Sequence, residues 1–229
     1  MPSASEQGSP QAPAEPSRGL RRLMKVSAVL LGCALLVLSA LRAVPALARN
    51  PTWALILALL GACLADFISG LVHWAADTYG DARTPVFGNF VNTFRVHHSD
   101  PRDIARHDAV EANADVFLFS APVHALLLVF VGNAFVSCFL VGLFCASYPN
   151  SQIHKWAHLP QRPRWVTRLQ RMRLLLDPER HAGHHTGLHQ TNYCITTGWL
   201  NPLLDRTRFF RGLEWLLERV GVARSPSQL

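Results

Sequence analysis

Long runs of residues without charge constrain this chain more than any other feature of its sequence. Residues 116–154 contain no Asp, Glu, Lys or Arg, and this run is about twice the ~20 residues that one helical crossing of a bilayer needs. Two earlier runs, 26–48 and 53–74, contain one such charged residue each. Because Gly132-Asn133 is a natural turn within the longest run, the sequence predicts four membrane helices.

We therefore expect an all-α integral membrane protein with about four transmembrane helices, at 26–48, 53–74, 114–132 and 134–153. The segments 75–113 and 154–205 would form a histidine-rich cap at one membrane face. Residues 1–17 are rich in Ser, Pro, Ala and Gln and are expected to form a disordered tail before one membrane domain over 18–229. A signal peptide is the alternative for the first run, but no clear small-x-small cleavage site follows it.

The distribution of basic residues predicts that the cap is cytoplasmic. Four basic residues precede the first helix, namely Arg18, Arg21, Arg22 and Lys25. Cytoplasmic flanks carry an excess of Lys and Arg, so the N-terminus and both cap segments are expected in the cytoplasm. Arg42 and Arg49, between the first two helices, oppose this assignment weakly. The Ala-, Leu- and Arg-rich composition favours a bacterial inner membrane over the endoplasmic reticulum.

The net charge of +7 is explained better by attraction to an anionic membrane surface than by nucleic-acid binding. Within 164–176 and 209–220, apolar residues recur at helical spacing among arginines. This pattern is typical of amphipathic helices that lie in the headgroup plane. Ordinary packing of a helix against the cap would produce the same pattern, so both interpretations stay open.

Ten of the eleven histidines stand at the ends of the apolar runs, on the predicted cytoplasmic side. They are His73, His97, His98, His107, His154, His158, His181, His184, His185 and His189. Imidazole is a frequent transition-metal ligand, and residues three or four apart share one helix face. A pair and a triplet of these histidines have that spacing, so we expect distant segments to build one metal centre. His124 lies inside an apolar run and is expected to pack between helices instead.

Four carboxylates are expected to support the histidines by hydrogen bonding rather than to act as ligands. They are Asp66, Asp77, Asp108 and Glu111. Asp66 lies within a membrane run, where an ionisable residue is costly and usually functional. It precedes His73 by seven residues, two helical turns, so we expect it to orient that ring.

The number of histidines indicates two metal ions and O2 chemistry. A zinc peptidase of the HExxH type is excluded because that motif is absent from the chain, as is GxSxG. A structural zinc site needs only four ligands, whereas two iron ions with O2 as co-substrate would use the larger set. We expect a lipid oxidase with no catalytic residue beyond the metal site, its lipid chain passing Phe67, Gly70 and Leu71. A metal transporter is disfavoured because only Asp66 and His124 lie deep in the runs.

Several motifs surround these histidines. They are DFISGLVHWAADTYG at 66–80, HHSDP at 97–101, RHD at 106–108, HKWAH at 154–158 and the stretch 181–201 that ends in YCITTGWLN. Together they resemble the Kua family of membrane lipid desaturases, over roughly residues 65–201. One departure is Gln190, which stands where the family pattern has Glu.

The resemblance implies a histidine-ligated di-iron desaturase in which the ten histidines form the metal site. The family reaction forms the vinyl-ether double bond of plasmalogens from 1-O-alkyl (plasmanyl) ethanolamine phospholipids. A chloroplast branch acts on palmitate of phosphatidylglycerol, so an ester-linked chain is an alternative substrate, and a di-iron lipid hydroxylase is an alternative activity. A separate donor of the cytochrome b5 or ferredoxin type would supply electrons, because the chain has no haem-attachment motif or flavin glycine fingerprint.

Overall fold

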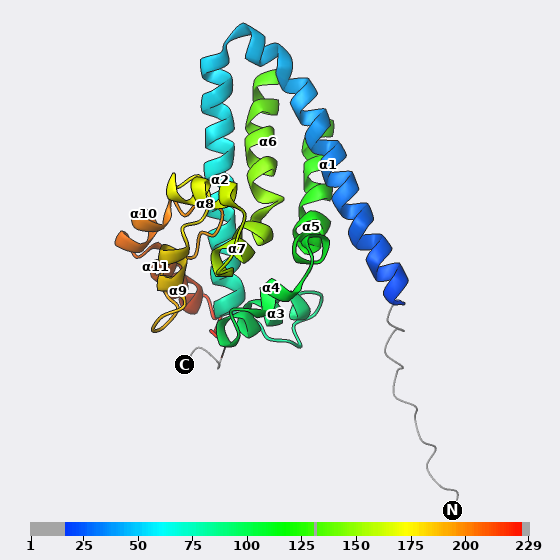
Figure 1. The fold of residues 1–229 in the computed structure, drawn as a ribbon. Coiled ribbons are helices and arrows are strands. Elements are labelled where there is room, and N and C mark those ends of the chain that lie inside the picture. The colour runs from blue at the N-terminus through cyan, green and yellow to red at the C-terminus, as the bar shows by residue number, and fades with distance from the viewer. Residues whose placement is uncertain (1–16, 131, 226–229) are drawn as a thin grey trace, which may run out of the picture.

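A computed structural model of the protein describes residues 17–130 and 132–225. Within these two ranges the secondary structure is all helical, with 74% helix and no strand, which confirms the predicted fold class. The predicted disordered tail lies outside the described residues except for Ser17. Figure 1 shows long helices standing side by side, with short helices gathered at one end.

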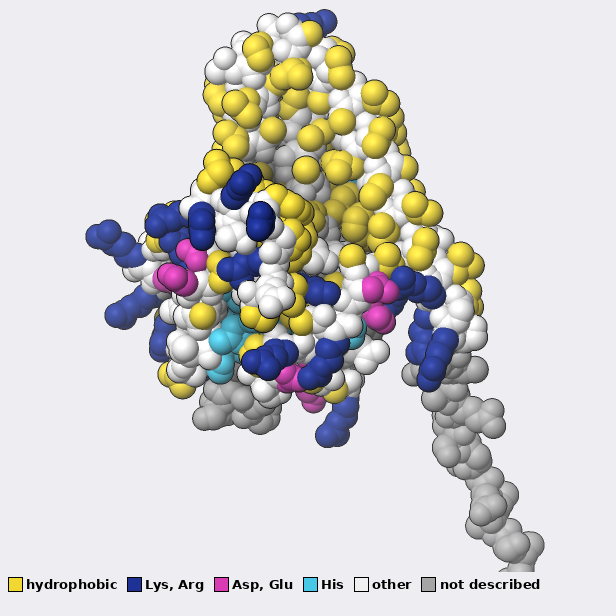
Figure 2. Space-filling view, in the orientation of Figure 1, with side chains coloured by type: hydrophobic (Ala, Val, Ile, Leu, Met, Phe, Trp, Pro, Cys, Tyr) yellow, Lys and Arg dark blue, Asp and Glu magenta, His cyan; other side chains and the backbone are white. Residues whose placement is uncertain are grey.

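Four helical segments are long and apolar enough to cross a membrane, as predicted. They are α1 (Arg18–Arg49), α2 (Pro51–Thr78), α5 (Ala109–Phe130) and the span Ala134–His158, which comprises α6 (Ala134–Ser147) and α7 (Asn150–His158). Figure 2 shows apolar side chains covering the column of long helices, whereas Lys and Arg gather around the short helices.

Asparagine side chains define the tight connections between the long helices. Asn50 ends α1 and begins α2, where its side chain accepts from the Trp53 N–H at 3.2 Å, and Pro51 occupies the first helical position. Asn133 accepts from the Phe135 N–H at 2.8 Å at the start of α6. These caps satisfy N–H groups that have no partner inside the helix. The predicted turn at Asn133 is thereby confirmed.

The fourth span is broken between α6 and α7, which the sequence analysis did not anticipate. The break falls at Tyr148 and Pro149. Proline lacks the N–H that an uninterrupted helix uses at this position, and its ring clashes with the preceding turn. The helix therefore restarts at Asn150, and α7 carries its two histidines at the level of the cap.

Glycines allow α2 and α6 to approach closely. A Cβ atom at Gly142 would lie 1.8 Å from the carbonyl oxygen of Ala58, and one at Gly61 would lie 2.1 Å from that of Phe139. Such small residues permit the backbone contacts that hold helices together in a membrane.

His124 packs between helices, as predicted. Its Nε2 lies 2.7 Å from Ser39 Oγ on α1, and its Nδ1 lies 2.9 Å from the Tyr148 hydroxyl. The ring stacks on Phe144 with centroids 3.7 Å apart. The residue thus connects α1, α5 and α6 and has no contact with the other histidines among the described interactions.

The cap consists of short helices at one end of the long ones (Figure 1). They are α3 (Gly88–Ser99), α4 (Asp103–Arg106), α8 (Arg164–Arg171), α9 (Pro178–His184), α10 (Asn201–Arg206) and α11 (Phe209–Arg219). In the two arginine-rich segments, some apolar residues pack against the cap, and others are exposed as a helix in the headgroup plane would require. Leu176 and Phe210 are buried in the cap, whereas Trp165, Met172 and Leu216 are exposed.

Candidate metal centre

Two groups of metal-ligand side chains meet inside the cap. The first, called the five-histidine cluster here, comprises His97, His154, His158, His181 and His185. The second, called the Asp77 cluster, comprises His73, Asp77, His98 and His184. In each group, one possible ligand atom per residue lies within 4.8 Å of all the others. Eight of the ten predicted histidines are therefore brought together from α2, α3, α7 and α9.

The five-histidine cluster is centred on the Nε2 atom of His181. This atom lies 2.7 Å from the Nε2 of His158, 2.8 Å from that of His154 and 3.1 Å from that of His185. His97 completes the group, with its ring centroid 4.5 Å from that of His154. His97 and His181 are almost fully buried.

Hydrogen bonding alone does not account for these contacts. A neutral imidazole nitrogen either donates one hydrogen bond or accepts one, yet the Nε2 of His181 faces three other nitrogens. Both ring nitrogens of His97 are buried without a hydrogen-bond partner. Nitrogens that ligate one ion at about 2.0–2.1 Å lie near one another at such separations. The donor set therefore fits a transition-metal ion.

Asp77 is the centre of the second cluster. Its carboxylate oxygens lie 3.4 Å from His73 Nε2, 3.1 Å from His98 Nε2 and 3.4 Å from His184 Nε2. Asp77 is 2% exposed, and the other groups beside it are imidazoles rather than Lys or Arg. From the sequence, Asp77 is predicted to support a ligand. Its position among three Nε2 atoms makes it a possible ligand itself.

Two backbone carbonyls orient histidines of the Asp77 cluster. His73 Nδ1 donates to the Tyr193 carbonyl at 3.0 Å, and His184 Nδ1 donates to the Thr191 carbonyl at 2.7 Å. Since a carbonyl oxygen only accepts, Nδ1 carries the proton in each neutral ring, and Nε2 presents its lone pair toward Asp77. The Nε2 lone pairs and the Asp77 carboxylate would repel one another, and a cation between them would remove this repulsion. This cluster also fits a metal ion.

The consecutive histidine pairs connect the two clusters. On α3, His97 belongs to the five-histidine cluster and His98 to the Asp77 cluster. At the end of α9, His185 and His184 divide in the same way. Neighbouring helical residues point about 100° apart, so each pair reaches both groups. The arrangement provides two adjacent clusters, each of which could hold a metal ion.

Burial keeps three histidines of the cap, His97, His181 and His185, neutral. The pKa of His97 and that of His181 lie well below the usual range, because burial disfavours the charged ring and neighbouring imidazoles add to the effect. Burial, followed by His158, lowers the pKa of His185 to about 2. Neutral imidazoles have lone pairs available for a metal at neutral pH.

The structure corrects the role expected for Asp66. Its carboxylate does not contact His73. It accepts instead from the backbone N–H groups of Thr197 at 2.8 Å, Gly198 at 2.9 Å and Leu200 at 3.3 Å. Asp66 therefore anchors the loop that follows α9 to helix α2, and it acts on the histidines only through that loop.

The loop at 191–200 contains functional groups that sequence reasoning missed. Its carbonyls at Thr191 and Tyr193 hold two histidines, and no side-chain pattern signals a backbone carbonyl. Asn201 fixes the loop by bonding both the N–H and the carbonyl of Cys194 at 2.8 and 2.9 Å. The motif YCITTGWLN was the one feature of the sequence that pointed to this loop, because its polar residues follow closely after the last histidines.

Two predicted histidines lie outside both clusters. His107 is 39% exposed and lies between Asp103 and Glu111, at 3.6 and 3.7 Å. The His189 ring lies beside His98, with centroids 4.4 Å apart, and its backbone φ is 53°. Their assignment to a metal stays a prediction.

The remaining predicted supports lie at the edge of the cap. Asp108 accepts from Arg22 at 2.9 Å, and Glu111 pairs with Lys25 at 3.4 Å. Gln190, the departure from the family pattern, accepts from Arg211 at 3.0 Å. None of these three residues contacts either cluster.

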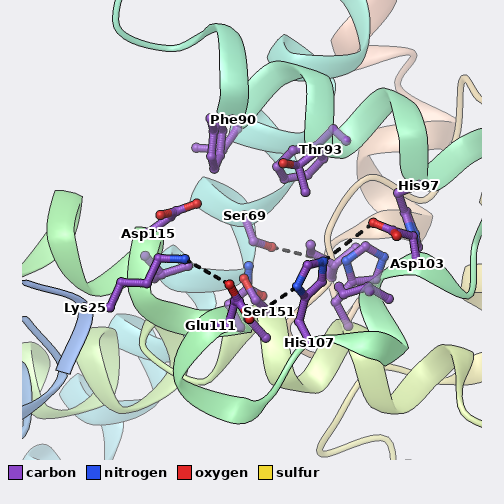
Figure 3. Close-up of a pocket in the computed structure, with 18 residues that line it drawn as sticks. Lys25, Ser69, Phe90, Thr93, His97, Asp103, His107, Glu111, Asp115 and Ser151 are labelled. Carbon is purple, nitrogen blue, oxygen red and sulfur yellow. Dashed lines mark hydrogen bonds and ion pairs between the residues drawn. The ribbon is translucent and has the colours of Figure 1, made fainter. Parts of the chain in front are cut away.

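A pocket of about 1050 Å³, part of it open to the surroundings, reaches the five-histidine cluster. Its buried end is lined by His97 and His154. Its exposed end, called the mouth here, is lined by Glu111 and Asp115 of α5 together with Lys25 of α1, which Figure 3 labels. The path expected along Phe67, Gly70 and Leu71 is wrong. The loop after α9 covers that face of α2, and a Cβ at Gly70 would lie 2.6 Å from Cys194 Sγ. Ser69 and Val72, on another face of α2, line the pocket instead.

The fold and the site together define a class of protein: a helical membrane protein with a buried histidine-rich centre that could hold metal ions. The chain belongs to the lipid desaturase domain family, whose model matches residues 62–227. This match begins within α2, at residue 62, and includes every residue of both clusters.

Named relatives agree with this membership. The chain is 43% identical over 172 residues to a plasmanylethanolamine desaturase of Myxococcus xanthus, which covers 72% of this chain and 61% of that protein. It is 41% identical to plasmanylethanolamine desaturase 1 of Mus musculus, over 69% of this chain and 62% of that protein. The chain thus spans about three fifths of the length of these relatives. Identity to the chloroplastic fatty acid desaturase 4 of Arabidopsis thaliana is 38%, over 67% and 48% of the two chains. No solved structure matches the chain.

Proposed function

We propose that the protein is a membrane di-iron desaturase that forms the vinyl-ether double bond of plasmalogens from 1-O-alkyl ethanolamine phospholipids. The observation that carries the proposal is the pair of adjacent clusters, rich in imidazole, at the inner end of a pocket beside the membrane helices. The names of the bacterial and mouse relatives support this choice of substrate.

The five-histidine cluster would hold one iron and the Asp77 cluster the other. Imidazole suits iron, and iron when bound supplies the one-electron and O2 chemistry needed to remove hydrogen from an unactivated carbon. In the balanced reaction the alkyl chain loses two hydrogens, two electrons and two protons enter from outside, and O2 becomes two waters.

The protein's own residues position the chain and exclude water. Val72, Phe94 and Ile195 line the pocket beside His97 and His154, so a hydrocarbon segment would be surrounded by apolar side chains next to the ligands. A dry, shaped site also protects reactive chemistry from side reactions. The Tyr193 and Thr191 carbonyls keep two ligand rings in the tautomer that binds metal.

Exposed arginines on and after α8 favour docking of an acidic electron donor. Arg164, Arg168, Arg171 and Arg173 are all exposed, and Figure 2 shows basic side chains gathered there. The same segment leads into α9, which carries the cluster histidines His181 and His184 and is followed directly by His185. A donor of the cytochrome b5 or ferredoxin type bound at this surface would lie close to the metal positions. Clustered charge of one sign also steers a partner of opposite sign.

Product analysis tests the proposal. The chain is expressed in a plasmalogen-free host that is supplied with alkyl ether lipid and a working electron donor, and lipids are analysed by mass spectrometry before and after acid. We expect acid-labile vinyl ethers from the wild type and none from His158→Ala. The matched control is Gln152→Ala, which changes the same helix outside both clusters.

The same measurement separates the alternatives. A double bond found only in ester-linked chains would favour the acyl-lipid substrate, and a hydroxylated chain would favour the hydroxylase. Vinyl ether formation by His158→Ala with full iron content would contradict the assignment of the metal site.

A further inference from the structure

Asp115 is a charged residue of the membrane helix α5 whose carboxylate has no ion-pair or hydrogen-bond partner in the described part of the chain. It is exposed and lies six residues after the first residue of the helix, which is about 9 Å along the axis. An ionisable side chain in a membrane span is costly unless a partner compensates it. A cationic partner from outside the chain would remove that cost.

The contact between α1 and α5 explains why this carboxylate is unpaired. Arg22 pairs with Asp108 at 2.9 Å, and one turn further along both helices Lys25 pairs with Glu111 at 3.4 Å. Asp115 lies four residues after Glu111, about one further turn along α5, and the residue four after Lys25 on α1 is the uncharged Val29. The first two carboxylates of this row therefore have a basic partner from α1, and the third does not.

Asp115 and Lys25 both line the mouth of the pocket that ends at the histidines. Figure 3 shows the two side chains on the same side of the pocket, with Glu111 beside Lys25. One continuous space thus joins a cation and an unpaired anion at its mouth to His97 and His154 at its inner end. A molecule that fills it would present charged groups at one end and a reacting carbon at the other.

We propose that this mouth binds the zwitterionic headgroup of an aminophospholipid, with Asp115 binding the ammonium group and Lys25 the phosphate. A primary ammonium group donates charge-assisted hydrogen bonds to a carboxylate. An anionic headgroup fits less well, because three carboxylates, Asp103, Glu111 and Asp115, line the pocket together with one lysine. Asp115 is thus the residue that distinguishes headgroups.

The position of the double bond in the lipid product agrees with a headgroup site at the mouth. This step rests on the proposed function. A vinyl-ether double bond lies next to the ether oxygen, only a few covalent bonds from the phosphate. The headgroup and the reacting carbons must then occupy the same pocket. A double bond formed far along a chain would impose no such condition.

Lipid binding and turnover together test the inference. Purified full-length protein in detergent receives an equimolar mixture of dioleoyl phosphatidylethanolamine and dioleoyl phosphatidylglycerol without an electron donor, and native mass spectrometry measures the bound ratio. The wild type is expected to prefer the ethanolamine lipid, and Asp115→Asn to lose about tenfold of that preference. Asp115→Lys should reverse the preference toward phosphatidylglycerol. Glu218→Gln, which makes the same charge change on α11 outside the pocket, should leave the ratio unchanged.

Each outcome decides the question. Equal binding of the two lipids by the wild type, or a ratio that neither Asp115 variant changes, would overturn the headgroup site. Turnover of ethanolamine and glycerol alkyl ether lipids then separates the two proposals. If no lipid gives vinyl ether but Asp115→Asn still changes the binding ratio, the headgroup site stands and the proposed reaction fails. If Asp115→Asn forms vinyl ether from both lipids in the wild-type ratio, the reaction stands and the headgroup site fails.

Discussion

At the scale of single residues, two neighbouring histidines have separate roles. His184 belongs to the Asp77 cluster and His185 to the five-histidine cluster. We expect His184→Ala and His185→Ala each to lose roughly half of the bound metal, because the other cluster keeps its ligands. Elemental analysis of protein purified with iron measures this. His124→Gln is the control and should keep its full metal content. An unchanged metal content in His184→Ala would contradict the two-site assignment.

Unlike the cluster histidines, His124 has a structural role, because its two ring nitrogens bond Ser39 and Tyr148 between helices. We expect His124→Ala to lower the free energy of unfolding by about 2 kcal/mol or more, since both partners lose a buried hydrogen bond. Thermal unfolding in detergent measures the loss, with metal content as the accompanying readout. A variant that keeps its stability but loses metal would show that the residue belongs to the site after all.

The buried histidines of the cap also predict how the metal-free protein responds to acid. The pKa of His97 and that of His181 are lowered by burial in the fold, whereas unfolded histidines titrate near about 6.5. Below that value the unfolded chain binds more protons than the folded one, so stability falls as pH decreases. Each of these two groups contributes up to about 1.4 kcal/mol per pH unit within this window.

The measurement is the melting temperature of chelator-treated protein at pH 7 and pH 5. We expect a lower value at pH 5 and a smaller difference in His97→Gln, which removes one titrating group. Equal melting temperatures at the two pH values would contradict the neutral state of the buried rings.

At the scale of elements, the loop at 191–200 transmits the influence of Asp66 to the metal centre. We expect Asp66→Asn to weaken the three hydrogen bonds that hold the loop, each worth about 1.5–3 kcal/mol when the acceptor is charged. The carbonyls that orient His73 and His184 would then move, so metal should be lost from the Asp77 cluster first. Metal content and the rate of proteolysis within the loop measure this, with Asp81→Asn as a matched carboxylate control. Faster proteolysis without metal loss would limit Asp66 to a structural role.

Hydrophobic patterning was sufficient to predict the elements that cross the membrane, because burial in lipid requires long uncharged helices. The spacing of His154 and His158 likewise placed two candidate ligands on one helix face. The spacing of residues in the sequence could not assign His97 and His98 to different clusters, since this assignment depends on how α3 crosses α7 and α9. It also misjudged Asp66 and the path along Gly70, because both depend on a loop more than 100 residues later in the chain. Local sequence thus predicted which histidines gather in the cap, and long-range packing decided how they divide between the two clusters.

At the scale of the whole molecule, charge and apolar surface divide the protein into two parts. On the face that Figure 2 shows, apolar side chains cover the long helices and basic ones gather over the cap. The hydrocarbon of a lipid and the metal positions therefore meet at the level where the two parts join. A cytoplasmic electron donor could reach this centre only if the cap faces the cytoplasm, so the orientation in the membrane bears on the proposed function.

Reporter fusions test that orientation. We expect alkaline phosphatase to be active when it is fused after Asn50 or Asn133, the two connections remote from the cap, and inactive at the C-terminus. A green fluorescent protein fusion should show the reverse. The physical reason is the group of four basic residues at the start of α1, whose retention in the cytoplasm fixes every later crossing. Arg42 and Arg49 act against this bias, so Arg49→Gln should leave the pattern unchanged, while replacing the four basic residues before residue 26 by Gln should weaken it. Active phosphatase at the C-terminus of the wild type would place the cap outside the cytoplasm and exclude a cytoplasmic donor.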